Sequence, residues 1–356
     1  MKLLVLLNEN PAGAHEDVYR AINSCIDNKI INEKFVFPFL AKLAKGVKEG
    51  QVLYEIVEIS KNYEPDLILW MHTDKLKVNQ DVINELRSLK NKPVMGLWDG
   101  DLYQSPYRPV PNELLELTVA CDVVFVQGFG EMTEKMKKKG CKDIRFVPAF
   151  GDDKRFYPIK NYQRKEHDIV MIGNNITSRN PFRITMNGTR LRKKIVNELS
   201  KKYNDKFAIY GNNWKGTYAK GAIPYLTQHK IYSKSKITIS VSNYTGKYYF
   251  SDRLPIAMLS GIPIVHNYEE GFEELFKDCK EIRFFKTFEE GIKQCEELLK
   301  KSSVELNEIG MKLHDYALKK LTIELVFKYM INVLKEIHFK KNDSEKIINP
   351  WLEGGL

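Results

Sequence analysis

The sequence has few cysteines and no long apolar run, and these absences narrow the classes of protein it can belong to. Five cysteines are scattered over 356 residues without a C-x-x-C pair, which argues against a disulfide framework or a zinc site and indicates a reducing, cytoplasmic setting. No apolar run is long enough to span a bilayer. The apolar residues 3–7 are too short for a signal peptide and run straight into Asn8 and Pro11, so they predict a first strand.

Glycine and proline are also modest in number, with 21 and 14 residues and no internal repeat, which excludes collagen-like, coiled-coil and low-complexity chains. Aromatic residues are plentiful, with 18 Tyr, 18 Phe and 4 Trp, and a chain of this kind is not disordered as a whole. The composition, 43% apolar and 29% charged, is that of a soluble globular protein. Its length predicts two domains, each with its own core.

Acidic residues are outnumbered, 46 against 56 Lys and Arg, and the resulting charge of +10 favours an anionic partner such as a nucleic acid, an anionic lipid or a phosphorylated small molecule. Compositional bias alone is the plain alternative. The basic run 135–139 fits the solvated face of a helix. The stretch 178–194 follows a predicted strand and contains no acid; its basic residues are Arg179, Arg183, Arg190, Arg192, Lys193 and Lys194.

Short apolar runs alternate with amphipathic stretches along the whole chain, a pattern that predicts βαβ units and parallel sheets. The predicted strands are 3–7, 66–71, 93–97, 122–126, 168–172, 207–210, 237–241, 262–265 and 281–284, and the clearest predicted helices are 82–89, 131–139, 188–202 and 323–339. Asp252 is expected to cap a short helix that ends at Gly261, and Thr287 with Glu290 forms a capping-box pattern. The fold class is therefore α/β, with two doubly wound parallel-sheet domains.

A polar stretch divides the two series of strands and predicts the domain boundaries. We expect a first domain over residues 1–155, a linker over 156–166 and a second domain over 167–325. Residues 326–356 form a last helix and tail, expected to pack back on the first domain. Ligands of such sheets bind beyond the carboxyl ends of the strands, so a cleft between the two domains is the expected site.

Small and polar residues follow most strands of the second series. Glycine lets a backbone approach a phosphate closely, a helix N-terminus offers free N–H groups, and an arginine can clamp a diphosphate. Each of these residues, taken alone, is explained as well by an ordinary turn or helix cap. Four such segments in one domain nevertheless favour a ligand site. The candidates are Gly173, Asn174, Gly211, Asn213, Trp214, Ser242, Asn243, Ser251, Asp252 and Arg253, with Arg192 from the basic stretch as a further phosphate partner.

The segment 249–265, with Ser251-Asp252-Arg253 and Ser260-Gly261, resembles the donor-binding segment of two-domain GT-B glycosyltransferases, and in particular the CgeB-like group of spore-associated enzymes. The resemblance covers about the second half of the chain. It implies that the second domain holds a nucleotide-sugar, with UDP-sugar expected, and that the first holds the acceptor. Looser similarity, in length and basic character, links the chain to phage DNA β-glucosyltransferases.

Two family positions depart from this pattern. The acid that binds the donor's ribose in many retaining members falls on Ile256, and a second acid falls on Tyr248. Glu270, or its neighbour Glu269, is the expected replacement for the ribose contact. The loss also raises the alternative of a relative without catalytic activity, since fold does not guarantee chemistry.

Asp99 and Asp101 follow the predicted strand 93–97 and are the candidate catalytic residues. In GT-A glycosyltransferases, an Asp-x-Asp after a strand holds a divalent metal. In the two-domain arrangement, a carboxylate at this strand end takes the proton from the acceptor hydroxyl. An ordinary turn is the third interpretation. We prefer the two-domain arrangement, in which Arg and a helix dipole neutralise the diphosphate and no metal is required.

On the acceptor side, Gly13 and His15 lie in the loop after the first strand and are expected to line the acceptor pocket, although an ordinary loop histidine is the plain alternative. The sequence thus predicts a cytoplasmic glycosyltransferase, hexosyl or pentosyl, acting on a hydroxyl of a glycan, protein, small molecule or modified DNA base. The alternatives are a basic nucleic-acid-binding protein, an inactive relative, and a membrane-surface protein using the helix 131–139. The sugar, the stereochemistry and the oligomeric state stay open.

Overall fold

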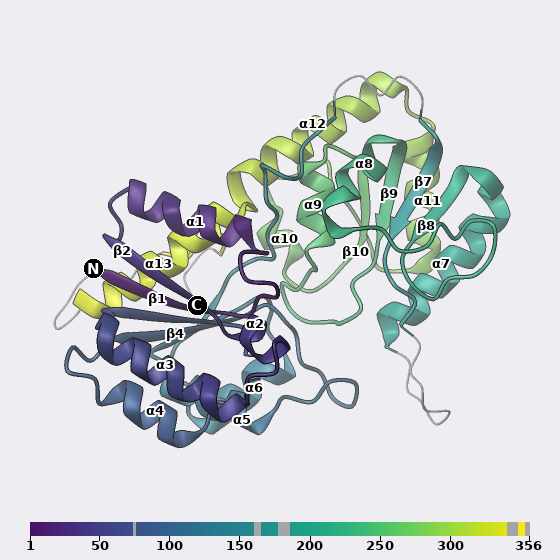
Figure 1. Ribbon diagram of the computed structural model, residues 1–356. Coiled ribbons are helices and arrows are strands. Elements are labelled where there is room, and N and C mark those ends of the chain that lie inside the picture. Colours follow the sequence, from purple (N-terminus) through teal and green to yellow (C-terminus); the bar gives the residue numbers. More distant parts are fainter. Residues whose placement is uncertain (74–75, 160–164, 177–185, 340–347, 353–356) are drawn as a thin grey trace. The chain divides into compact units, whose positions relative to one another are not determined.

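The computed structural model describes residues 1–73, 76–159, 165–176, 186–339 and 348–352 (Figure 1). The chain forms two compact units, and each is described by itself. The first unit combines Met1–Pro148 with Ile323–Leu356, and the second unit is Ala149–Thr322. The chain therefore leaves the first unit once and returns to it with its last long helix.

The first unit has a parallel sheet of six strands in the order β2-β1-β3-β4-β5-β6. Its strands are β1 (Lys2–Leu7), β2 (Glu33–Pro38), β3 (Leu67–Met71), β4 (Val94–Asp99), β5 (Val123–Val126) and β6 (Ile144–Phe146). Its helices are α1 (Glu16–Asp27), α2 (Phe39–Ala44), α3 (Glu49–Tyr63), α4 (Gln80–Arg87), α5 (Asn112–Ala120), α6 (Glu131–Lys139) and α13 (Ile323–Phe339). The strand order reverses between β1 and β3, which makes their carboxyl ends the switch point of the sheet.

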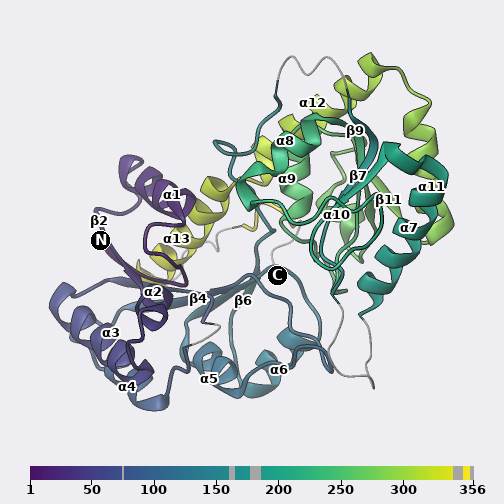
Figure 2. The same cartoon turned by 45° about the vertical axis from the view of Figure 1, so that its right-hand side comes forward.

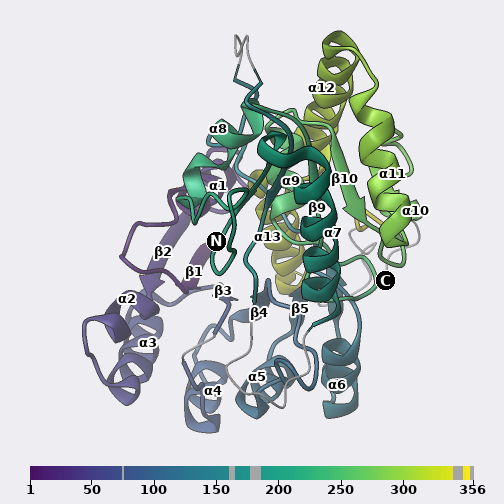
Figure 3. The same cartoon turned by 90° about the vertical axis from the view of Figure 1, so that its right-hand side faces the viewer.

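Helices cover both faces of this sheet. Helices α3, α4, α5 and α6 line one face (Figure 3), and α1 with α13 covers the other (Figure 2). The approach of α13 is close: a Cβ added at Gly96 of β4 would lie 2.7 Å from Leu334 Cδ2. Glycine at this position lets the helix pack directly on the strand. Lys335 Nζ also donates to the carbonyl of Ile30, at 3.1 Å.

The second unit has a parallel sheet of five strands in the order β11-β10-β9-β7-β8. Its strands are β7 (His167–Ile172), β8 (Phe207–Tyr210), β9 (Ser235–Ser240), β10 (Ile264–Asn267) and β11 (Arg283–Phe285). Its helices are α7 (Asn187–Tyr203), α8 (Gln228–Ser233), α9 (Arg253–Leu259), α10 (Phe272–Leu275), α11 (Phe288–Leu299) and α12 (Ser303–Lys320). Apolar residues of α9 and α12 pack in one core cluster and those of α7 and α11 in another.

The structure differs from the sequence prediction in several local features. The predicted linker, residues 156–166, begins at Phe156, yet the ring of this residue is buried in the core of the second unit, since burial of a large aromatic side chain is favourable. Asp252 stands before α9, yet its side chain makes no capping hydrogen bond. Thr287 does cap α11, accepting from the Glu290 N–H. No helix of the described residues has the length and apolar character that crossing a membrane requires.

Candidate active site

At the carboxyl edge of the second unit, Arg192 of α7 fills the switch point between β7 and β9. Its Nε donates to the Val241 carbonyl at 2.9 Å, where Nη2 also donates, and its Nη1 donates to the Asn174 carbonyl at 3.2 Å. The side chain is 1% exposed. Arg192 was predicted to contact phosphate. In this structure its donors are used to join two strand ends, and burial keeps the guanidinium from solvent.

Arg192 has no carboxylate partner among the described residues. Burial, followed by the charge of Arg253, holds the pKa of Arg192 well below its usual range. Arg253 itself is partly exposed, at 22%, and its nearest acid is Asp252, at 3.9 Å from Nη1. Two neighbouring cations with so little compensating negative charge create a positive potential that favours an anion.

Several polar atoms around these arginines lack a hydrogen-bond partner within the described ranges. They are Arg253 Nε, Ser251 Oγ, Ser242 Oγ, Ser240 Oγ and His266 Nε2, and all are buried. Ser240 and His266 are paired in register at the carboxyl ends of β9 and β10. Unused buried donors and acceptors are costly, and their concentration at one sheet edge is a signature of a site that a ligand completes. We call this set the orphan cluster.

His266 is neutral at physiological pH. Burial lowers its pKa to about 4, with smaller contributions from Arg253 and Arg192. Its Nδ1 lies 2.7 Å from the Asn267 carbonyl, an atom that only accepts, so Nδ1 carries the proton and Nε2 is a bare acceptor. His266 was not among the sequence candidates, although it stands at a predicted strand end.

Hydrogen bonds link the loop after β7 to the loop after β8. Trp214 Nε1 donates to the Gly173 carbonyl at 2.7 Å, and the Asn174 side chain accepts from the Asn212 N–H at 2.8 Å. Asn213 Nδ2 donates to the Asn175 carbonyl at 3.2 Å. A Cβ at Gly211 would lie 2.3 Å from the Gly173 oxygen, so this close approach requires glycine. Asn174, Asn213 and Trp214 thus use polar atoms to build the loops, and direct donor contact by them stays a prediction.

Of the two acids proposed for the ribose contact, Glu270 is the exposed one. Its carboxylate, 74% exposed, lies 3.8 Å from Lys247 Nζ. Glu269 is buried and accepts from Asn267 Nδ2 at 2.8 Å and from the Gly246 N–H at 3.2 Å. Asn267 in turn accepts from the Ser242 N–H at 2.7 Å. Glu269 therefore ties the loop after β9 to the end of β10, and burial raises its pKa to about 7.

Other predicted residues lie around this edge with less distinct contacts. Asn243 accepts from Thr189 Oγ1 at 3.3 Å. Arg179 and Arg183, from the basic stretch, lie outside the described residues. A cavity of about 300 Å³ opens at the opposite, amino-terminal edge of the sheet, beside Lys165, Ser235 and Pro263. Doubly wound sheets bind ligands at the carboxyl edge, which favours the orphan cluster over this cavity as the place for a ligand.

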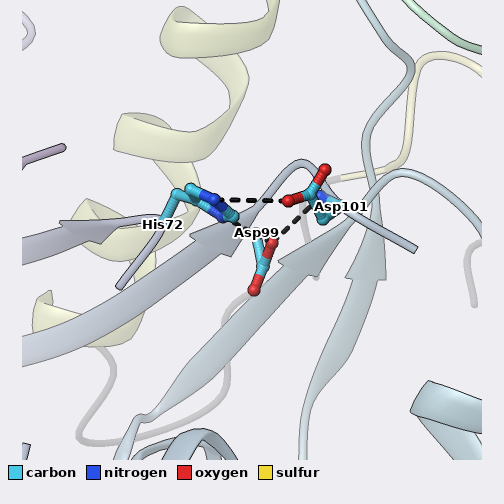
Figure 4. Close-up of side chains that lie close together, drawn as sticks. All are labelled: His72, Asp99 and Asp101. Atoms are coloured by element: carbon cyan, nitrogen blue, oxygen red, sulfur yellow. Dashed lines mark hydrogen bonds and ion pairs between the residues drawn. The ribbon is translucent and has the colours of Figure 1, made fainter. Parts of the chain in front are cut away.

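In the first unit, the candidate acids belong to a compact group with His72, which sequence reasoning missed. His72 directly follows β3, Asp99 ends β4, and Asp101 lies two residues further on (Figure 4). His72 Nδ1 is 2.9 Å from Asp99 Oδ1, and His72 Nε2 is 3.3 Å from Asp101 Oδ2. Asp99 Oδ1 also accepts from the Asp101 N–H at 2.9 Å. A titratable residue after the strand 66–71 was the available signal.

The three side chains are close enough to hold a cation, since their facing atoms lie within 4.8 Å of one another. Those atoms are already engaged, however. Asp99 Oδ1 has two hydrogen-bond partners, and Asp101 Oδ2 forms an ion pair with Arg108, whose guanidinium lies 4.6 Å above the Tyr103 ring. Arg108 already pairs with Asp101, the more accessible of the two acids, so a metal at this place would have to compete with its guanidinium.

Gly13 and His15 lie in the loop after β1, at the switch point of the first sheet. Buried Glu9 organises this loop by accepting from the N–H groups of Gly13 and His15, at 3.0 and 3.2 Å, and from Tyr19 Oη at 2.6 Å. The His15 ring is about half exposed, with Nδ1 3.9 Å from Asp17 Oδ1. The basic helix α6 behaves as a solvated face, with Lys135 and Lys137 paired to Glu131 and Glu134.

Residues 190–332 match the family model described as "Glycosyl transferase-like". The match includes α7 with Arg192 and the loop and helix that carry Ser251 and Arg253. The predicted class, glycosyltransferase, is confirmed, and neither a nucleic-acid-binding protein nor an inactive relative is favoured. The CgeB-like group, the similarity to phage DNA glucosyltransferases and DNA modification have no support from the comparisons. A search of the curated proteins finds no match.

Several solved structures are similar in fold over nearly the whole of this chain. Anabaena HepE in complex with UDP and glucose has a TM-score of 0.58 at 13% identity, covering 94% of this chain and 100% of that one. A glycosyltransferase from Rickettsia africae gives 0.60 at 12%, with coverage of 96% and 99%. The E. coli trehalose-6-phosphate structure bound with UDP-2-fluoro glucose gives 0.62 at 12%, with coverage of 94% and 99%. These likenesses confirm the predicted GT-B fold of two parallel-sheet domains.

Proposed function

We propose that the protein transfers a hexose from a UDP-sugar to an acceptor hydroxyl, and that the second unit holds the donor. The observation that carries the donor site is the orphan cluster beside Arg192 and Arg253, two cations for which the described residues supply a single acid, Asp252, at 3.9 Å from Arg253. Structural neighbours bound to UDP and glucose, or to UDP-2-fluoro glucose, support the choice of donor.

In this proposal, Arg253 contacts the diphosphate directly, because it is the cation of the pair that solvent reaches. Its guanidinium and the Ser251 hydroxyl would donate to phosphate oxygens, and the electrostatic stabilisation would increase as the diphosphate departs with its extra negative charge. Arg192 adds charge from behind while it holds the strand ends. Gly173, Gly211 and Ser242 provide the close backbone approach at the same edge.

The acceptor contributes a hydroxyl, the group shared by glycans, proteins, small molecules and hydroxymethylated bases. We place its binding on the first unit, around Asp101, Gly13 and His15, which lie at the carboxyl edge of that sheet. This assignment follows the general rule for doubly wound sheets.

The test is donor binding by the full chain. Titration calorimetry with UDP, UDP-glucose, GDP-mannose and ADP-glucose should give affinity for the uridine nucleotides. Arg253→Ala should weaken UDP binding about 10- to 150-fold, the equivalent of about 1.5–3 kcal/mol for a charge-assisted contact. Arg283→Ala, an exposed arginine on β11, is the matched control and should bind UDP as the unaltered protein does. Equal affinity in the Arg253 variant and its control would reject the site.

A further inference from the structure

The cavity at the amino-terminal edge of the second sheet has a polar lining with charge of one sign. Its volume is about 300 Å³, at the lower end of the range of small-molecule pockets. Two lysines, Lys165 and Lys236, and no acid are among the described residues that line it. The other polar side chains of the lining include four serines and an asparagine: Ser233, Ser235, Ser260, Ser303 and Asn307. Such a wall favours an anionic ligand over an empty space, because empty cavities are apolar.

Lys165 provides the cation that an entering anion would pair with. Its Nζ donates to the Ser233 carbonyl at 2.7 Å, and it forms no ion pair with an acid among the described residues. Burial lowers the pKa of Lys165, and no neighbouring acid counteracts this shift. Lys236 differs, since its Nζ lies 2.8 Å from Asp168 Oδ1. An ammonium held by a carbonyl alone gains a stronger, charge-assisted hydrogen bond when an anion reaches it.

The serines of the wall indicate what else the ligand carries. Ser233, Ser235 and Ser260 each donate the hydroxyl hydrogen to a main-chain carbonyl three or four residues earlier, at 2.9, 3.0 and 2.7 Å. A hydroxyl has one hydrogen, so these three oxygens can only accept from a ligand. The cavity therefore combines a cationic donor with several hydroxyl acceptors. A small molecule that joins an anionic group to several hydroxyls matches this combination, and a sugar phosphate is such a molecule.

The walls of the cavity belong to the packed part of the second unit. Tyr232, Ser235 and Ile262, which line it, are all buried. Helix α12 packs tightly against the turn after α9, which forms another wall: a Cβ added at Gly310 would lie 2.0 Å from the Gly261 oxygen. Walls that are fixed before the ligand arrives are typical of small-molecule sites.

We propose that this cavity binds a sugar monophosphate, with the phosphate at Lys165 and the sugar hydroxyls at Ser235 and Ser260. The ligand is a second molecule, because the orphan cluster lies at the carboxyl edge of the sheet and the cavity at the amino-terminal edge. A nucleotide-sugar is larger than a sugar monophosphate by a nucleoside and a phosphate, and a cavity of this volume favours the smaller ligand.

The test is titration calorimetry of the full chain with glucose 1-phosphate, glucose 6-phosphate and fructose 6-phosphate. At least one of them should bind about ten-fold or more tightly than inorganic phosphate or glucose, which each present half of the ligand. Lys165→Gln keeps a donor for the Ser233 carbonyl but removes the charge, and should weaken this binding about ten-fold or more. Lys293→Gln, at an exposed lysine of α11, is the matched control and should bind as the unaltered protein does.

Two further variants separate the sugar from the phosphate and this cavity from the donor site. Ser235→Ala should weaken the sugar phosphate several-fold and leave the affinity for inorganic phosphate unchanged. Arg253→Ala should leave the sugar-phosphate affinity unchanged, and saturating UDP should not displace the ligand. Thermal unfolding without ligand checks that each variant is folded.

Three results would overturn the proposal. They are no binding of any of the three sugar phosphates, equal affinity for inorganic phosphate, and an affinity that Arg253→Ala abolishes while Lys165→Gln preserves it. The UDP titrations of the proposed donor site are independent of these results, so either proposal can fail without the other.

Discussion

The carboxyl edges of the two sheets differ in how far their charged side chains have partners within the protein. In the first unit, each acid has a partner: Asp99 faces the His72 ring, and Asp101 forms an ion pair with Arg108. In the second unit, Arg192 and Arg253 lie near several unpartnered polar atoms, and the described residues give this pair of cations one acid, Asp252, at 3.9 Å from Arg253. In the first group the acids already have partners, so no ligand charge is needed to balance them. The unbalanced edge of the second unit is suited to holding an anion, because binding supplies the missing charge.

The largest expected effect comes from removing the buried cation of the unbalanced edge. Arg192→Leu should lower the free energy of unfolding by about 3–4 kcal/mol, because the Val241 and Asn174 carbonyls lose their charged donor. Urea unfolding measures the change. Arg190→Leu, at an exposed position of the same helix, should stay within about 0.5 kcal/mol. If the two variants are equally stable, Arg192 does not join the strand ends as described.

A pH series tests the acid that fixes the loop at this edge. The pKa of Glu269 is raised from 4.5 to about 7 in the folded chain. Between these two pH values the folded chain therefore binds more protons at this residue than the unfolded chain does. As a result, the contribution of Glu269 to the free energy of unfolding falls as pH rises. The advantage of the unaltered protein over Glu269→Gln should therefore grow by up to about 3 kcal/mol from pH 8 to pH 5. A difference that is constant with pH would show that Glu269 ionises normally.

His266 makes the free energy of unfolding depend on pH in the opposite direction to Glu269. Its pKa is lowered from 6.5 to about 4, so the unfolded chain binds the extra proton, and stability is lost as pH falls through this range. Between about pH 4.5 and 6.5, folding adds a proton at Glu269 and removes one at His266, so the two effects on the pH dependence of stability cancel. Glu269→Gln should thus make the second unit more sensitive to acid than the unaltered protein, which thermal unfolding at pH 7 and pH 5 would reveal.

A smaller effect is expected where the loops of the second unit are fastened. Trp214→Phe keeps the aromatic bulk but removes the donor to the Gly173 carbonyl, which should cost about 1 kcal/mol of stability. UDP affinity should fall only a few-fold if the tryptophan holds the loop, and far more if its ring contacts the nucleotide. Calorimetry on the variant separates the predicted direct contact from the structural one.

The smallest change in stability is expected at the carboxyl edge of the first sheet. Arg108→Ala should change stability by less than about 1 kcal/mol, since its partner Asp101 is 36% exposed and solvent screens the pair. UDP release from UDP-glucose should also change, because Asp101 would lose its charged partner beside His72. Unchanged release together with unchanged stability would argue that Arg108 plays no part in the group.

The long periodic elements were predictable from the sequence. The helices 131–139 and 323–339 have the predicted bounds, because their apolar spacing and flanking signals agree. Strand β2 was missed, since it is short, partly exposed and carries Glu33, Lys34 and Pro38. Helix α12 was missed although Ser302 and Glu305 form its capping box, because Gly310 interrupts a good helical pattern.

The site was predictable in outline but not in its contacts. Ser251, Arg253 and Asp99 were found because they stand at strand ends or helix starts. The burial of Arg192 was not, since an arginine in a basic stretch gives no sign of facing two carbonyls from distant strands. His72 was missed because its importance depends on Asp99, 27 residues away, through a pairing that only the sheet creates.

The discontinuity of the first unit has a consequence for synthesis on the ribosome. Its sheet is complete after residue 146, but α13, which packs on β3 and β4, emerges only after all of the second unit. Until then the surface that Leu334 covers at Gly96 lies bare, while the second unit already has every element it needs. Domains tend to fold as they emerge, so the later half of the chain would reach its native state first and the earlier half would wait for the last helix.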